Sequence, residues 1–261
     1  MGLVMSEVKH PTYIASRGRA LTCTTPEILE SGGVDTFYLV VEPQEADEYR
    51  ERFGDDRVLV LPFSDRGIAA ARTWIKKYSE QQGEAWHWQF DDDILRFCIR
   101  KEKEPNVIVP ASEPMTFVET FADKYSNIGA CGIASIQWPT KKPIVVNQQV
   151  YTTVLVLNGT PFYWRDNCVE DTDFSLQILA NGWCTVLFKN YRAQSSPTMS
   201  MPGGNTDITH GGELGDRRAY RTRGLQSKWP GLIKMKRGCG LPKASTAHLW
   251  KKFTTPLKEK E

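Results

Sequence analysis

Alternation between apolar and polar residues predicts an α/β fold in the first ninety residues of the chain. Short apolar runs that are typical of buried strands alternate with segments whose apolar residues recur every three or four positions, as in helices that cover a sheet. The expected strands are 12–15, 36–41, 57–61 and 85–90, and the expected helices are 25–29, 45–53 and 68–78. This order is typical of a mostly parallel central sheet flanked by helices.

The pattern is less regular in the second half of the chain. Apolar runs there predict strands 128–136, 145–157 and 185–188, and helical spacing predicts helices 115–125 and 170–180. A segment rich in Gly, Ser, Thr and Pro, residues 197–215, is expected to be a loop.

Composition indicates a globular protein without a membrane span. Hydrophobic residues make up 40% of the chain, and no apolar run approaches the roughly 20 residues needed to cross a bilayer. Residues 1–10 lack the basic and apolar regions of a signal peptide. The six cysteines form no C-x-x-C pair, so reduced thiols in a cytoplasmic protein are the simplest interpretation.

Positive charge is concentrated near the end of the chain. Residues 217–252 hold eleven Lys or Arg and no acid. The positive and negative charges of residues 253–261 cancel, and the net charge of the whole chain is +2, so residues 1–216 have a net charge of −9. Such a segment suggests a polyanionic partner. The alternative is a solvated tail, but the segment also holds large apolar residues, including Trp229 and Trp250. The candidate nucleic-acid contacts are Arg217, Arg218, Arg221, Arg223, Lys228, Lys234, Lys236 and Arg237.

Three adjacent carboxylates, Asp91, Asp92 and Asp93, follow the apolar strand 85–90 directly. Ligand sites in open α/β sheets lie beyond the carboxyl ends of strands, and adjacent carboxylates repel one another unless a cation lies among them. Oxygen ligands suit Mg²⁺ or Mn²⁺, which commonly join carboxylates to a diphosphate. Since side chains alternate in extended backbone, Asp91 and Asp93 can face one site while Asp92 turns away. The alternative is a solvated turn with a helix cap.

Two further groups of residues could carry chemistry. Glu170 and Asp171 open the helix 170–180, where acids can also serve only as partners of the helix dipole. His210 lies among glycines and could close onto a ligand or a metal, although a single histidine is often structural or solvated.

Arginines near two predicted loops suit a diphosphate. Arg17 and Arg19 follow the first strand, and Arg66 and Gly67 precede the helix 68–78, which also carries Arg72. Guanidinium groups and the free backbone N–H groups at the start of a helix both bind phosphate oxygens.

In this order, with a second strand that ends in Glu42, these features resemble a GT-A nucleotide-sugar glycosyltransferase, a Rossmann-like fold. More narrowly, Asp65-Arg-Gly-Ile-Ala-Ala-Ala-Arg72, the Trp-x-Phe-Asp-Asp-Asp-Ile stretch and Val169-Glu-Asp-Thr-Asp173 resemble the phage glycosyltransferases associated with TET/JBP-type base oxidation. The resemblance covers about residues 11–215. The expected domains are a catalytic domain, 1–216, and a basic segment, 217–261, packed on it or continuous with it.

The resemblance implies that the enzyme moves sugar from a UDP-sugar to 5-hydroxymethylcytosine in duplex DNA, with Mn²⁺ or Mg²⁺, in the host cytoplasm. It implies that Asp91, Asp93 and His210 bind the metal and that Glu170 and Asp171 lie near the acceptor, where Asp171 could accept the hydroxyl proton. The expected donor-site residues are Arg17, Arg19, Glu42, Arg66, Gly67, Arg72, Asp91 and Asp92.

Two alternatives remain open from the residues alone. One is a GT-A enzyme that acts on a glycan, a protein or a small molecule. The other is a metal-dependent nuclease or phosphotransferase that uses the same acids, or a DNA-binding protein without enzymatic activity. A nuclease needs only metal to cleave a strand, whereas a glycosyltransferase depends on a sugar nucleotide.

Overall fold

The computed structural model describes residues 7–101, 106–137, 142–197, 202–204, 214–238, 241–245 and 248–261. Its strands are β1 (Thr12–Ala15), β2 (Phe37–Val41), β3 (Val58–Val60), β4 (Trp86–Asp91), β5 (Ile94–Ile99), β6 (Val107–Val109), β7 (Ile128–Ser135), β8 (Ile144–Val146), β9 (Thr153–Leu157), β10 (Cys184–Ser195), β11 (Lys234–Gly238) and β12 (Leu241–Ser245). Its α-helices are α1 (Thr25–Ser31), α2 (Ala46–Phe53), α3 (Gly67–Gln81), α4 (Ser112–Ala122), α5 (Glu170–Ala180) and α7 (Leu214–Lys228).

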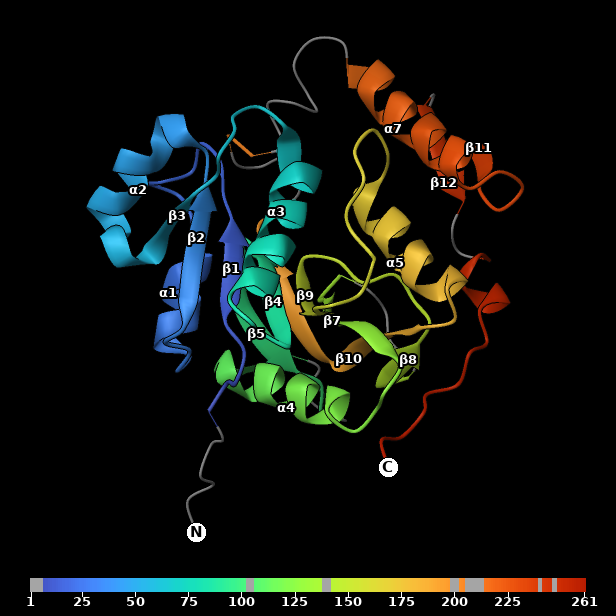
Figure 1. Cartoon of the computed structure of the whole chain (residues 1–261), viewed down its shortest axis with the longest axis horizontal. Helices are drawn as coiled ribbons and strands as arrows, with labels where there is room; N and C mark the ends of the chain where they lie inside the picture. The colour runs from blue at the N-terminus through green and yellow to red at the C-terminus, as the bar shows by residue number, and fades with distance from the viewer. Residues whose placement is uncertain are drawn as a thin grey trace.

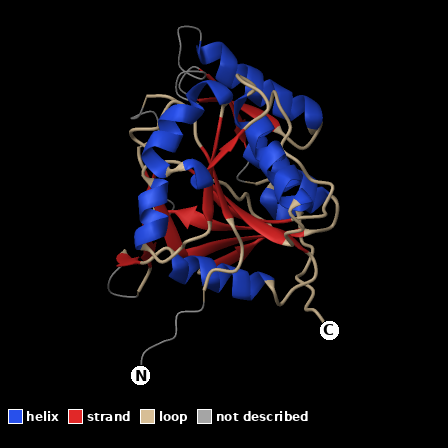
Figure 2. Ribbon diagram, turned by 60° about the vertical axis from the view of Figure 1, so that its left-hand side comes forward, coloured by secondary structure: helices blue, strands red, loops and turns tan. Residues whose placement is uncertain are grey.

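One large mixed sheet forms the centre of the protein (Figure 2). Among the described strands its order is β3-β2-β1-β4-β9-β7-β10-β5-β6, and β8 pairs with β10. The first four strands are mutually parallel, as the alternation of the first half predicts. β9 then runs antiparallel to both β4 and β7, so the second half of the sheet is mixed. The predicted α/β, Rossmann-like fold class is confirmed.

Helices cover both faces of this sheet because successive strand residues point to opposite sides. Tyr13 and Val40 pack against Ile75 of α3, whereas the adjacent Ile14 and Leu39 belong to the core under α1 and α4. α5 lies beside α3 on the face of the sheet that carries Tyr13 and Val40 (Figure 1). No described helix combines the length and the apolar character that crossing a bilayer requires.

The structure differs from the sequence prediction between residues 145 and 157. The single predicted strand is divided into β8 and β9, because Asn147 and Thr152 have φ angles of 60° and 67° and turn the chain out of extended backbone. The predicted short strand 185–188 is the first part of the longer β10, which continues through polar residues to pair with β5. The pattern did not predict β5.

The basic segment contributes α7 and the hairpin of β11 and β12. α7 packs outside α5 (Figure 1) through an apolar cluster that joins Leu225 to Leu176 and Leu179. The expected domain boundary between residues 216 and 217 falls inside this helix.

Residues after Trp250 run back along the protein to the residues that follow α4 (Figure 1). Asn147 Nδ2 donates to the carbonyls of Phe253 and Thr255 at 3.1 and 3.0 Å. Asn127 exchanges hydrogen bonds with the backbone of Pro256 and Lys258, at 2.9 and 2.8 Å. This end of the chain is therefore part of the fold.

Candidate active site

The three adjacent aspartates lie at the carboxyl end of β4. Asp91 is the last residue of β4, and Asp92 and Asp93 form the turn that leads to β5. In the parallel register of β1 and β4, Ala15 lies opposite Asp91, so the loop after β1 reaches the same edge. This edge is where ligands bind in open α/β sheets.

Asp91 and Asp92 have different partners. Arg72 Nη2 donates to Asp91 Oδ1 at 2.7 Å, and the Asp91 side chain remains 35% exposed. Asp92 is buried and accepts hydrogen bonds from Ser16 Oγ at 2.6 Å and Arg19 Nη1 at 2.7 Å. In this position Asp92 anchors the loop that follows β1.

Burial, together with the charge of Asp91, raises the pKa of Asp93, so Asp91 and Asp93 form a pair that suits a divalent cation. Burial raises the pKa of Asp93 to about 7, and the charges of Asp91 and Asp92 act in the same direction. Burial also raises the pKa of Asp91, while Arg72 opposes the shift. A cation between the two carboxylates would relieve this repulsion, and carboxylate oxygens suit Mg²⁺ and Mn²⁺. The pair therefore fits a metal that takes further oxygen ligands from phosphate and water.

The remaining part of the predicted metal site is not tested by the described residues. Within them, no three His, Cys, Asp or Glu side chains form a ready-made metal cage. The predicted third ligand, His210, lies outside the described residues.

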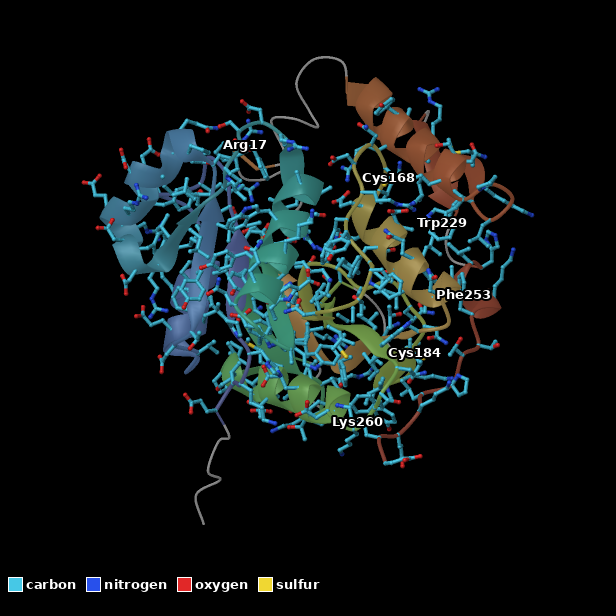
Figure 3. All side chains as sticks on the ribbon, viewed as in Figure 1. Arg17, Cys168, Cys184, Trp229, Phe253 and Lys260 are labelled. Atoms are coloured by element: carbon cyan, nitrogen blue, oxygen red, sulfur yellow. The ribbon has the colours of Figure 1, made fainter. Side chains whose placement is uncertain are left out.

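The loop Ser16–Arg19 is joined to the start of α3 through Glu42. This buried carboxylate lies 3.2 Å from Arg17 Nε and accepts a 3.0 Å hydrogen bond from the backbone N–H of Asp65. Arg17 also pairs with Asp65, and its side chain is 31% exposed. The predicted donor-site residues Arg17 and Glu42 therefore lie together, and Figure 3 shows Arg17 at this edge of the sheet.

Arg19 joins Asp92 to the described part of the loop after β10. It donates to the carbonyls of Pro202 and Gly203 at 3.0 and 3.2 Å. A Cβ atom on Gly203 would lie 2.6 Å from the carbonyl oxygen of Gly18, so only glycine fits this approach. Arg19 therefore fixes the position of both loops.

The start of α3 presents an open stretch of backbone near Arg17. Asp65 and Gly67 have φ angles of 57° and 76°, and no atom lies within 4 Å of the position that a Cβ on Gly67 would take. The guanidinium of Arg66 lies 5.1 Å from the centre of the Phe63 ring. An accessible helix start of this kind is suited to phosphate oxygens.

Asp171, the second residue of α5, is linked to Asp91 by Arg72, which donates to both carboxylates. Arg72 Nη1 donates to Asp171 Oδ1 at 3.0 Å, and the Asp171 side chain is 20% exposed. The indole N–H of Trp164 donates to the same oxygen at 3.4 Å. Burial raises the pKa of Asp171 to about 7; Arg72 opposes the shift, and Glu170 and Asp91 add to it.

The side chain of Glu170 points toward α7. It pairs with Arg221 of α7, which also donates to the carbonyl of Cys168 at 3.1 Å. Arg221, a predicted nucleic-acid contact, therefore lies against α5, and Figure 3 shows Cys168 close to this junction.

The sequence analysis did not identify Asp173 as important. This carboxylate is fully buried and accepts hydrogen bonds from Arg165, Gln177 and the indole of Trp229, the last at 2.7 Å. An acid three residues after Glu170 lies on the face of α5 that α7 covers. The spacing could have shown that Asp173 shares a face with Glu170, but not that Trp229 reaches it.

Within α7 and β11, the side chains of Tyr220, Arg223 and Lys234 are exposed. Lys228 is half-buried. The side chains of the other predicted contacts, Arg217, Arg218, Lys236 and Arg237, lie outside the described part.

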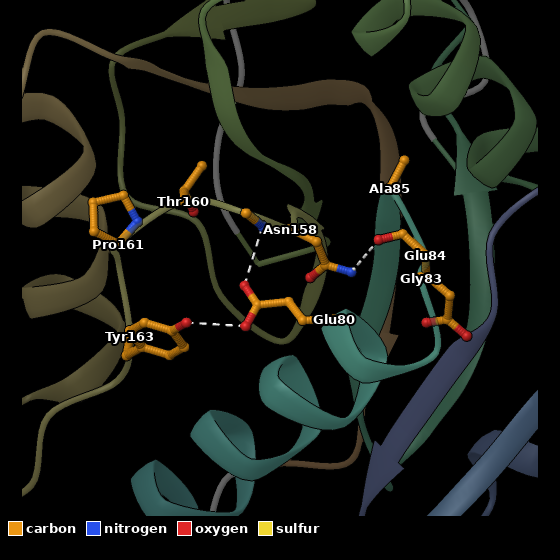
Figure 4. A pocket seen from close by; sticks show the side chains of 9 residues that line it. Glu80, Gly83, Glu84, Ala85, Asn158, Thr160, Pro161 and Tyr163 are labelled. Atoms are coloured by element: carbon orange, nitrogen blue, oxygen red, sulfur yellow. Dashed lines mark hydrogen bonds between the residues drawn. The ribbon is translucent and has the colours of Figure 1, made fainter.

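A separate open hollow of about 700 Å³ lies at the opposite end of β4, before Trp86 (Figure 4). Its carboxylates already have partners: Glu80 accepts from Tyr163 and the backbone of Gly159, and Glu84 accepts from Tyr13. The hollow is therefore distinct from the acidic edge around Asp91.

Comparisons with known proteins identify the family of the chain. The model of the family described as TET-Associated Glycosyltransferase matches residues 10–204. No curated protein sequence matches the chain. Solved structures similar to it include the inositol-1-phosphate CTP transferase from T. maritima, with 15% identity over 72% of this chain and 89% of that chain and a TM-score of 0.40. Another is the mannose-1-phosphate geranyltransferase from Thermus thermophilus, with 13% identity, 96% and 73% coverage and a TM-score of 0.37.

The family match includes every strand from β1 to β10, the three aspartates and α5. It favours the glycosyltransferase interpretation over the nuclease and the DNA-binding protein without activity. Because the match spans well over half of the chain, the protein belongs to the TET-associated glycosyltransferase family and is a transferase with a GT-A-like fold.

Proposed function

We propose that the protein moves a sugar from a UDP-sugar to the hydroxymethyl group of 5-hydroxymethylcytosine in DNA, with Mn²⁺ or Mg²⁺. One observation carries this proposal: a single buried arginine, Arg72, links the carboxylates of Asp91 and Asp171 at the ligand-binding edge of the sheet. This link provides one acid for the donor side and another for the acceptor side. Membership of the family supports the reaction class, and the hydroxymethylated base is what the resemblance described above implies.

The donor diphosphate would lie between the loop Ser16–Arg19 and the start of α3. Arg17 is partly exposed there, and the backbone around Gly67 is open. Asp91 and Asp93 would hold the metal, whose charge stabilises the departing diphosphate when it is bound.

The acceptor hydroxyl would approach Asp171. A pKa of about 7 leaves this carboxylate able to accept a proton at neutral pH. The hydrogen bond from Arg72 and the weaker one from Trp164 fix the direction of the carboxylate. Close alignment of the hydroxyl with the sugar carbon supplies much of the rate in such reactions.

DNA would contact the exposed basic part of α7 and β11. Tyr220 is 55% exposed, and Arg223 of the same helix and Lys234 of β11 are exposed as well. These cations can contact phosphates, and Tyr220 can stack on an unpaired base. The target base must leave the helical stack to reach a site at the sheet edge.

The direct test is incubation with a panel of UDP-sugars, Mn²⁺ or Mg²⁺, and DNA that contains either cytosine or 5-hydroxymethylcytosine. We expect the released nucleosides to gain the mass of one sugar only with the hydroxymethylated DNA. Transfer to cytosine DNA, or transfer without any metal after exhaustive chelation, would contradict the proposal.

The same assay distinguishes the alternative acceptors. Release of UDP without any change in the nucleosides would direct the search to a glycan, a protein or a small molecule. Strand cleavage with metal alone would support the nuclease instead.

A further inference from the structure

Among the described residues at the acidic edge, Arg72 is the most deeply buried cation. It belongs to the second turn of α3, and its side chain is only 5% exposed. Its two terminal nitrogens donate to different carboxylates, Nη2 to Asp91 and Nη1 to Asp171. Gln89 donates to its backbone carbonyl at 3.1 Å, which ties this turn of α3 to β4.

This position is unsuited to a direct contact with the donor diphosphate. Both Nη atoms already have carboxylate partners, and Trp164 lies alongside, with its ring centre 5.8 Å from the guanidinium carbon. Arg17 also pairs with two carboxylates, Glu42 and Asp65, but its side chain is 31% exposed at the edge near the open start of α3, against 5% for Arg72. Of the two, Arg17 is the one that incoming phosphate oxygens can reach.

We infer that Arg72 is a positioning residue for sugar transfer: its planar guanidinium fixes the donor-side carboxylate of Asp91 relative to the acceptor-side carboxylate of Asp171. The inference rests on the proposed function for the roles of the two acids. A guanidinium offers a rigid fork of donors that can serve two carboxylates at once. An ammonium carries the same charge on one flexible point and cannot reproduce that fork.

The test compares Arg72→Lys with the parent protein. The variant keeps the charge, so we expect UDP affinity, measured by calorimetry without metal, to change by less than about twofold. We expect kcat for transfer to fall about 100-fold, the loss typical of reacting groups displaced by about 1 Å. In Arg72→Ala, added guanidinium should restore part of kcat, whereas methylammonium should not.

The matched control is Arg165→Lys, which alters another arginine that makes two bonds to one buried acid, Asp173. We expect this control to lose stability without losing kcat, so that melting curves separate a folding defect from a positioning defect. An unchanged kcat in Arg72→Lys would overturn the inference. A tenfold loss of metal-free UDP affinity would overturn it as well, by placing Arg72 at the diphosphate.

The role of Arg72 can still be tested if 5-hydroxymethylcytosine in DNA is not the acceptor. If the parent protein transfers no sugar to DNA, the same variants are compared in UDP-sugar hydrolysis, where water replaces the base hydroxyl. Equal hydrolysis by the parent and Arg72→Lys would then overturn the inference independently.

Discussion

The surroundings of Asp171 set the pH at which it can act. Because burial raises its pKa to about 7, the carboxyl is protonated below that pH and cannot accept a hydroxyl proton. We therefore expect kcat, measured with saturating metal, to fall as the pH drops below about 7, at a midpoint that the cation beside Asp91 lowers. Saturating metal matters because Asp93 also has a pKa of about 7, and a bound cation lowers it.

Asp171→Asn should remove this pH dependence together with the activity. We expect kcat to fall about 10²- to 10⁴-fold, the usual contribution of a general base. UDP affinity, followed by calorimetry, should stay close to that of the parent protein. A collapse of UDP affinity would instead assign Asp171 to the nucleotide or metal site.

The adjacent residues Asp92 and Asp93 provide a pair of contrasting substitutions. Asp93→Ala removes a proposed metal ligand and relieves repulsion, so we expect weaker Mn²⁺ binding, at least about 100-fold lower kcat and little loss of stability. Asp92→Ala leaves Arg19 without its buried carboxylate partner, so we expect a loss of about 3 kcal/mol of unfolding free energy.

Electron paramagnetic resonance of Mn²⁺ and urea denaturation would measure the two effects. Chelation should abolish the activity of the parent protein, and added Mn²⁺ or Mg²⁺ should restore it. Undiminished Mn²⁺ binding in Asp93→Ala would remove this residue from the metal site.

Sequence reasoning located the acids but not the link between them through Arg72. Three carboxylates at the end of a buried strand are a local pattern, and the parallel sheet brings that strand end to a ligand-binding edge. Arg72 and Asp171 are 99 residues apart, and their meeting depends on how α3 and α5 pack side by side. No local spacing contains that information.

At the level of elements, Asp173 holds α5 and α7 together. Its buried carboxylate accepts from Arg165 and from Trp229. Asp173→Ala would leave both donors without their partner, so we expect a loss of about 3–5 kcal/mol of unfolding free energy, measured by urea denaturation. The exposed Asp166 is the control, and Asp166→Ala should change stability by less than about 0.5 kcal/mol. Equal stability of the two variants would show that Asp173 does not dock α7.

The predicted elements agree best with the structure where the apolar pattern is strong. The ends of β1, β2 and β4 lie within one residue of the prediction. The break between β8 and β9 was missed because positive φ angles at Asn147 and Thr152 leave no apolar signal. α7 was missed because few of its residues are apolar, so its position depends on single contacts such as that of Leu225.

At the level of the whole molecule, charge is divided between an acidic body and a basic segment. Log affinity for duplex DNA should fall linearly with log salt, and each phosphate contact contributes about 0.9 to the slope. Arg223→Glu with Lys234→Glu should therefore reduce the slope by about 2 and leave UDP-sugar hydrolysis intact. Arg221 is excluded from this variant because it pairs with Glu170.

The control for this variant makes the same change in net charge elsewhere. Lys124 and Lys260 are exposed, and Figure 3 shows Lys260 at the end of the protein away from Arg17. Lys124→Glu with Lys260→Glu should bind DNA with nearly the parental slope. Equal losses in both double variants would mean that net charge alone, and not this surface, determines binding.

The return of residues 253–258 to Asn127 and Asn147 has a consequence for biosynthesis. These two asparagines lie in the middle of the chain, and their amide groups bind backbone that the ribosome makes more than a hundred residues later. Until that backbone has left the exit tunnel, both amides lack these hydrogen-bond partners, and the last segment is not yet packed against the sheet. Completing these contacts therefore requires residue 258 to have emerged from the exit tunnel.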